Sequence, residues 1–225
     1  MDIDNFIDYN DGIEVSAGGV LPHWHQNRRI QFVTFRLSDS LPKSKINELL
    51  EVKQRFEMAH PKPWAADVFR QYWDMIGPQE ERILAAGLGS CVLRSRDVRL
   101  ILSDVLHYRD GNHYTLHAYV IMPNHVHMLI QPHHDFKLNQ IIKSIKGYSA
   151  RSINRLLNRT GSIWMKESYD RIVRSEDDFR RCRCYIADNP KHLPPTDYTL
   201  YIAGETPAEA SGGAETSTSP NAGRW

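Results

Sequence analysis

The sequence predicts a single domain of mixed strands and helices, and three observations carry that prediction. Residues 31–37 are mostly aromatic or β-branched, as is typical of a strand. Residues 119–130 hold two apolar runs separated by Pro123-Asn124, which predicts two strands meeting at a tight corner. Apolar residues recur every three or four positions over residues 138–157, the period of an amphipathic helix. A chain of 225 residues is long enough to bury one sizeable core.

The elements before the corner can be placed in order. Residues 1–20 show little periodicity and predict a flexible N-terminal arm. After the first strand, the apolar spacing between Lys43 and Phe56 predicts an amphipathic helix. Further helices are expected up to Leu106, with a break near Gly77-Pro78. A turn then leads into a strand over residues 113–122.

The elements after the long helix at 138–157 are shorter. Residues 163–164 and 169–173 predict short extended pieces. Ser175 precedes three acidic residues, a pattern typical of a helix start, because the acids suit the positive end of the helix dipole. That helix should end near Asn189, since Pro190 follows. Residues 203–225 lack large apolar side chains until the last position and predict a disordered tail.

Composition and charge narrow the classes of protein. The chain is 41% apolar and 24% charged, with no apolar run long enough to cross a membrane and an acidic N-terminus unlike a signal peptide, so we expect a cytoplasmic protein. The net charge is only +1, yet residues 143–183 hold eleven basic and five acidic side chains. This basic segment indicates either a polyanionic partner, with nucleic acid first among the candidates, or a solvated helix face.

His125 and His127 follow the corner directly. Successive side chains of a strand point to opposite faces, so the two imidazoles share one face while Val126 and Met128 share the other. Such a pair can form half of a metal site. A His-x-His pair on an amphipathic strand is more often a polar, surface-facing decoration, and the pair alone does not decide between the two.

Tyr185 and Asn189 stand one turn apart on the last predicted helix and share a face. A tyrosine hydroxyl can act as a covalent nucleophile, and an amide oxygen can complete a metal shell begun by two histidines. Imidazole with amide oxygen and water suits Mg²⁺ or Mn²⁺, which would polarise a phosphate oxygen. Residue type leaves Tyr148 and Tyr169 open as rival nucleophiles.

Four motifs occur in order along the chain: Pro123-Asn124-His125-Val126-His127, then residues 161–164, then residues 170–177, then Tyr185-Ile186-Ala187-Asp188-Asn189-Pro190-Lys191. Together they resemble the single-tyrosine HUH transposases, most closely the branch of REP-associated tyrosine transposases within the IS200-like group. The resemblance spans residues 20–200. It implies an α+β fold of the ferredoxin-like type, an antiparallel sheet with helices packed on it, forming one domain over residues 21–202.

The resemblance also implies an activity. His125 and His127 would bind Mg²⁺ or Mn²⁺ with Asn189 as third ligand, and Tyr185 would attack a phosphodiester of single-stranded DNA, leaving a 5′-phosphotyrosine. The substrate would be hairpin DNA of repetitive palindromes, bound by a monomer or a homodimer. Phosphate contacts and base stacking would come from residues around the basic segment, namely Lys143, Lys146, Arg151, Arg155, Trp164 and Arg171.

The stretch 57–95 is longer than a minimal catalytic core of this family needs, which predicts a helical insertion.

Two further possibilities stay open. The chain could be a descendant that binds DNA hairpins without cutting them. It could also be a metal-dependent hydrolase of small phosphorylated substrates that shares only the histidine pair.

Overall fold

The structure is a computed structural model that describes residues 6–7, 14–17, 22–26, 28–61, 64 and 66–205. Much of the predicted flexible arm over residues 1–20 lies outside the described residues, although residues 14–17 within it form a strand. Of the predicted disordered tail, residues 206–225 lie outside them as well.

A five-stranded sheet with the order β6-β3-β5-β4-β7 is the centre of the fold. Its strands are β3 (Gln31–Arg36), β4 (Tyr114–Ile121), β5 (His125–Pro132), β6 (Tyr169–Ile172) and β7 (Thr199–Ile202). All neighbouring strands are antiparallel. The four strands β3, β4, β5 and β6, with helices between β3 and β4 and between β5 and β6, have the ferredoxin-like order. Strand β7 extends the edge of the sheet at β4. The predicted α+β, ferredoxin-like fold is confirmed.

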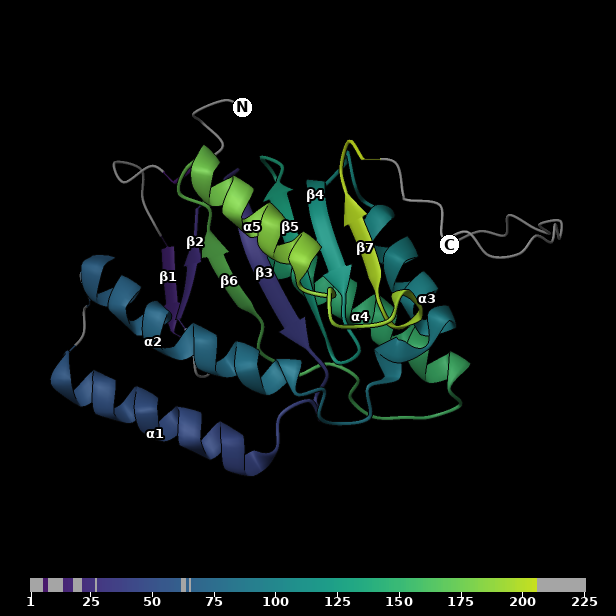
Figure 1. Cartoon of the computed structure of the whole chain (residues 1–225). Coiled ribbons are helices and arrows are strands. Elements are labelled where there is room, and N and C mark those ends of the chain that lie inside the picture. The colour runs from purple at the N-terminus through teal and green to yellow at the C-terminus, as the bar shows by residue number, and fades with distance from the viewer. Residues whose placement is uncertain are drawn as a thin grey trace, which may run out of the picture.

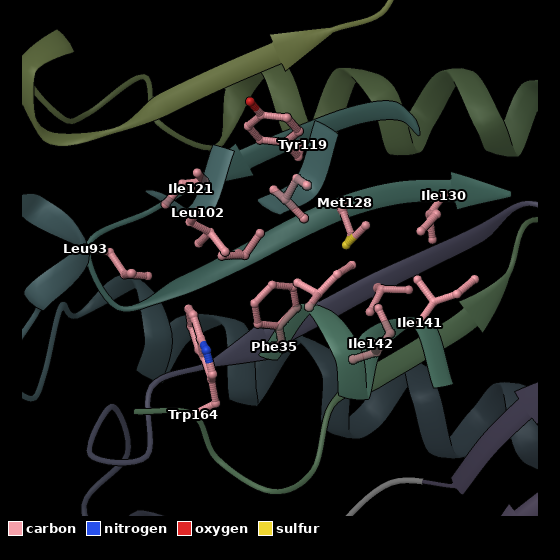
Figure 2. Close-up of a cluster of buried hydrophobic side chains, with 14 of the residues drawn as sticks. Phe35, Leu93, Leu102, Tyr119, Ile121, Met128, Ile130, Ile141, Ile142 and Trp164 are labelled. Atoms are coloured by element: carbon pink, nitrogen blue, oxygen red, sulfur yellow. The ribbon is translucent and has the colours of Figure 1, made fainter. Parts of the chain in front are cut away.

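Helices cover both faces of this sheet (Figure 1). α3 (Arg96–His107) and α4 (Leu138–Leu156) lie on one face, and α5 (Glu176–Asp188) lies on the other. The alternation along β5 explains the two cores. Val126, Met128 and Ile130 enter the core beneath α3 and α4, which Figure 2 shows, whereas Leu129 packs with the α5 side. His125 and His127 have the same parity as Leu129 and therefore face α5.

Two long helices, α1 (Lys43–Ala59) and α2 (Ala66–Ala85), form an antiparallel pair between β3 and α3 in the chain (Figure 1). The predicted break at Gly77-Pro78 is wrong, because α2 continues through Pro78. A proline inside a helix costs about 3 kcal/mol. Tyr72, Ile76 and Leu84 are almost fully buried on both sides of it, and each buried apolar side chain gains roughly 1.5–3 kcal/mol, which outweighs that cost.

Three strands were not predicted. β1 (Glu14–Ala17) and β2 (Pro22–His25) form a separate two-stranded sheet, and β7 pairs with β4. Short 3₁₀ helices occupy Val92–Arg94 and Pro195–Asp197. Among the described residues, no helix has the length and apolarity needed to cross a bilayer.

Candidate active site

His125 and His127 lie at the start of β5, directly after the Pro123-Asn124 corner, and their ring centroids are 4.6 Å apart. Their exposures are 2% and 0%, so the expectation of a surface-facing pair is excluded. The predicted sharing of one face is confirmed by the pairing, because His127 lies opposite Thr34 and His125 opposite Arg36 on β3. Burial lowers the pKa of His125 to about 3, with the neighbouring His127 adding to the effect, so its ring is neutral.

Each imidazole is oriented through its Nδ1 atom. Nδ1 of His125 is 2.7 Å from Oδ1 of Asn124, and Nδ1 of His127 is 2.7 Å from Oγ1 of Thr34. The amide of Asn124 is itself fixed, because its Nδ2 donates to the carbonyls of Leu84 and Leu88. Oδ1 of Asn124 can only accept, so Nδ1 of His125 carries the proton and Nε2 bears the lone pair. The Nε2 atoms of both histidines are buried and make no hydrogen bond.

Glu81, on the last turn but one of α2, completes a three-residue cluster with the histidines. Its Oε2 lies 3.5 Å from Nε2 of His127, and one ligand atom from each residue lies within 4.8 Å of the others. Burial alone would raise the pKa of Glu81, but the imidazoles of His127 and His125 and the Tyr185 hydroxyl hold it at about 2, so the group is a carboxylate.

Two contacts dock α2 so that Glu81 reaches this position. Glu80, the preceding residue, forms an ion pair of 3.2 Å with Nε of Arg36 on β3. Asn124 binds the C-terminal end of α2 through the carbonyl of Leu84, whose side chain is 1% exposed. No sequence pattern marks Glu81 as a site residue, because it belongs to the acidic pair Glu80-Glu81 within a stretch predicted as an insertion.

Tyr185 on α5 faces this cluster. Its hydroxyl donates a 2.5 Å hydrogen bond to Oε2 of Glu81, and its ring centroid lies 5.3 Å from that of His127. Burial raises the pKa of Tyr185, and the negative charge of Glu81 raises it further, while a hydrogen bond from Asn189 acts in the opposite direction. Asn189 follows the last residue of α5 and lines the same cleft as Tyr185.

The two rival tyrosines are placed differently. Tyr148 lies on α4, on the opposite face of the sheet, and its ring lies beneath the guanidinium of Arg151 at 4.7 Å. Tyr169 on β6 packs edge-on against Phe32 at 6.3 Å and also lines the cleft. Tyr185 contacts both the ring of His127 and the carboxylate of Glu81.

A cleft of about 1100 Å³ lies over the site, lined by residues of α2, α5 and the sheet. Among the six predicted DNA-contacting residues, Arg171 lines it, held by a bidentate pair with Asp178 at 2.8 and 3.3 Å. Side chains that the sequence analysis did not single out also line it, including the exposed Arg82, Arg174 and Arg181. Arg174 and Arg181 fall within the basic segment 143–183 but were not named there as DNA contacts, and Arg82 lies outside that segment.

The other predicted DNA contacts are not brought to the cleft. Lys143, Lys146, Arg151 and Arg155 belong to α4, on the far face of the sheet. Nζ of Lys146 donates to the carbonyls of Lys166 and Glu167, and burial lowers its pKa to about 8. Trp164 is 5% exposed, donates its indole N–H to Ser149 and packs against Phe35, so the structure does not support its predicted role in base stacking.

The residues present fit a divalent cation. Two unpaired imidazole nitrogens and a carboxylate converge on one point, and the Nδ1 hydrogen bonds to Asn124 and Thr34 are the supporting contacts that metal-bound histidines usually have. The donor set of nitrogen and carboxylate oxygen suits several divalent ions, Mn²⁺ among them.

Residues 93–189 match the family described as "Transposase IS200 like". Over these residues, the chain is similar to the IS200-like transposases. The matched segment includes both histidines, Tyr185 and Asn189, and it excludes α1 and α2, which carry Glu81.

One solved structure, described as "Structure of the REP associates tyrosine transposase bound to a REP hairpin", is similar to this chain at 15% identity and a TM-score of 0.40, covering 87% of this chain and 97% of that one. Among curated proteins, no relative matches the sequence.

Proposed function

We propose that this chain is an IS200-like transposase that cleaves and rejoins single-stranded DNA, with Tyr185 as the nucleophile and a divalent cation held by His125 and His127. The observation that carries the proposal is the convergence of the Tyr185 hydroxyl and the histidine pair on one carboxylate within a single cleft. The family match over these residues supports it. The sequence resemblance adds Asn189 as a cation ligand.

In the forward reaction, Oη of Tyr185 forms a bond to the scissile phosphorus and the bond from phosphorus to the 3′ oxygen breaks. The products are a 5′-phosphotyrosine and a strand ending in a 3′-hydroxyl, which takes up one proton as the tyrosine loses one. The reverse reaction of another 3′-hydroxyl rejoins strands. Bound to the imidazoles, the cation would act as a Lewis acid on a phosphate oxygen.

The chain's own side chains prepare this reaction. Without the cation, the hydrogen bond to Glu81 fixes the direction of the Tyr185 hydroxyl, and Phe32 supports the ring edge-on at 5.8 Å. Arg82, Arg171, Arg174 and Arg181 give the cleft positive charge for the phosphates of a single strand. Tyr185, His125, His127 and Glu81 lie together within one chain, and the sequence resemblance leaves a monomer and a homodimer both open. The preference for hairpin DNA rests on the sequence resemblance.

The test is to incubate the protein with labelled single-stranded hairpins and Mn²⁺ and look for a covalent adduct on a denaturing gel. Tyr185→Phe should abolish the adduct. Tyr148→Phe is the matched control, because Tyr148 is a 54% exposed tyrosine on the opposite face. Hairpin binding without an adduct across a panel of substrates would favour the non-cleaving descendant. Absence of salt-sensitive DNA binding would favour the hydrolase.

A further inference from the structure

We propose that Glu81 is a protein ligand of the divalent cation, so that the α1–α2 helical pair supplies part of the metal centre from outside the segment that matches the family. This inference rests on the proposed metal-dependent function. It differs from the ligand set that the sequence resemblance implies, in which Asn189 joins the histidines.

The first argument is the separation of the donor atoms. Oε2 of Glu81 and Nε2 of His127 are 3.5 Å apart, which is long for a hydrogen bond between nitrogen and oxygen. Two atoms that bind one divalent ion at about 2.0–2.2 Å lie roughly 3–4 Å from each other. The spacing therefore suits two ligands of a shared ion better than it suits a hydrogen-bonded pair.

The second argument is charge. Glu80 has a permanent cationic partner in Arg36. The carboxylate of Glu81 contacts the ring of His127 and the hydroxyl of Tyr185, and neither group is a permanent cation. The side chain of Glu81 is only partly exposed, at 33%, so a permanent cation beside this carboxylate would be favourable. A divalent cation bound by the two orphaned Nε2 atoms would supply that positive charge.

The third argument is that the position of Glu81 is fixed by the fold. The Arg36–Glu80 pair and the Asn124 hydrogen bonds attach α2 to β3 and to the residue that orients His125. Gly89, just after α2, packs so closely on the backbone of Asp39 that a Cβ there would lie 2.5 Å from its carbonyl oxygen. The segment that carries Glu81 is thus docked at two places, the last turns of α2 and the loop that follows the helix.

The proposal has a consequence for the nucleophile. The same Oε2 atom accepts the Tyr185 hydrogen bond and lies nearest His127. Removing the hydroxyl leaves the carboxylate free for the ion, so Tyr185→Phe should bind Mn²⁺ at least as tightly as the unaltered protein.

The experiment measures Mn²⁺ binding to the full chain without DNA, by the electron paramagnetic resonance signal of free Mn²⁺. Glu81→Gln should weaken binding about 30-fold, within the range of roughly 10–100-fold seen when groups around a metal site are altered. Glu48→Gln is the control, because it removes the same charge from an exposed residue of α1 whose ion-pair partner is Lys45 and not the sheet, and it should change Kd less than about threefold. Glu81→Asp, which keeps the carboxylate but shortens the side chain, should be intermediate.

Thermal melting without metal checks that each variant folds. If Glu81→Gln does not fold, Glu81→Asp takes its place in the binding measurement. The inference is overturned if Glu81→Gln binds Mn²⁺ as the unaltered protein does, or if Glu48→Gln weakens binding equally. Loss of binding in His125→Ala with no loss in Glu81→Gln rejects only the role of Glu81. Unchanged binding in both His125→Ala and His127→Ala rejects the metal centre of the proposed function itself.

Discussion

Asn124 joins the histidine pair to α2, and replacing it should damage both stability and metal binding. The side chain is 1% exposed and makes three hydrogen bonds, one with His125 and two with the carbonyls of Leu84 and Leu88. Asn124→Ala would leave those groups without their partner, at a cost of about 1–3 kcal/mol for each that water cannot reach. Since one carbonyl is at a partly exposed site, we expect a total loss of about 2–5 kcal/mol.

Urea unfolding followed by circular dichroism measures that loss, and Mn²⁺ titration should show binding about 10–100-fold weaker because His125 loses its orienting contact. Asn124→Asp separates the two roles. It keeps the oxygen acceptor for His125 but removes the donors to α2, so stability should fall while Mn²⁺ affinity declines less than in Asn124→Ala. A free energy of unfolding within about 0.5 kcal/mol of the unaltered protein for Asn124→Ala would refute the reasoning, since surface changes fall in that range.

Three other predictions concern single contacts. Thr34→Val keeps the shape of the side chain but removes the partner of His127 Nδ1, so Mn²⁺ titration should show about tenfold weaker binding. Asp178→Asn should cost about 1.5–3 kcal/mol in urea unfolding at pH 7, because Arg171 loses a charged partner. Burial opposes ionisation of Asp178, but the hydrogen bond from Arg171 lowers its pKa below the ordinary aspartate range. The difference in unfolding free energy between Asp178→Asn and the unaltered protein is therefore full at pH values above the ordinary aspartate pKa and should vanish as the pH falls through the lowered pKa. A difference in unfolding free energy that does not change with pH would contradict this prediction. Trp164→Phe should leave DNA binding unchanged, whereas Arg174→Ala with Arg181→Ala should lower the salt slope of single-strand binding by about 1.4; equal effects would restore the stacking role of Trp164.

Local pattern was enough to predict β3, β4, β5 and β6 and the helices α1, α4 and α5, because each carries either an apolar period or a run of β-branched and aromatic residues. The corner at Pro123-Asn124 placed both histidines on one face, and the spacing of Tyr185 and Asn189 placed both on one helical face. These inferences depend on residues that are neighbours in the chain or one helical turn apart, which is the range over which periodicity carries information.

Two features depend on tertiary structure and were beyond that range. The period of the α4 helix predicts a buried face but not which side of the sheet the helix covers. It therefore did not show that the basic residues of α4 lie on the face opposite the cleft. Glu81 meets the histidines only because α2 docks through Arg36 and Asn124, contacts between residues that are 40 or more positions apart in the sequence. A glutamate in an acidic run has no signature of its own.

The shared carboxylate links the nucleophile to the metal centre. If the cation and the Tyr185 hydroxyl both use Oε2 of Glu81, binding of one weakens binding of the other, and the coupling is the same in both directions. A hydrogen bond between a carboxylate and a hydroxyl is worth about 1.5–3 kcal/mol, so the linkage could change affinity by roughly one to two powers of ten. The metal-free site would then hold Tyr185 protonated and restrained, and cation binding would release the hydroxyl toward a phosphate in the cleft. Tighter Mn²⁺ binding by Tyr185→Phe is the direct sign of that coupling, and equal affinity would mean that the hydroxyl and the cation do not compete.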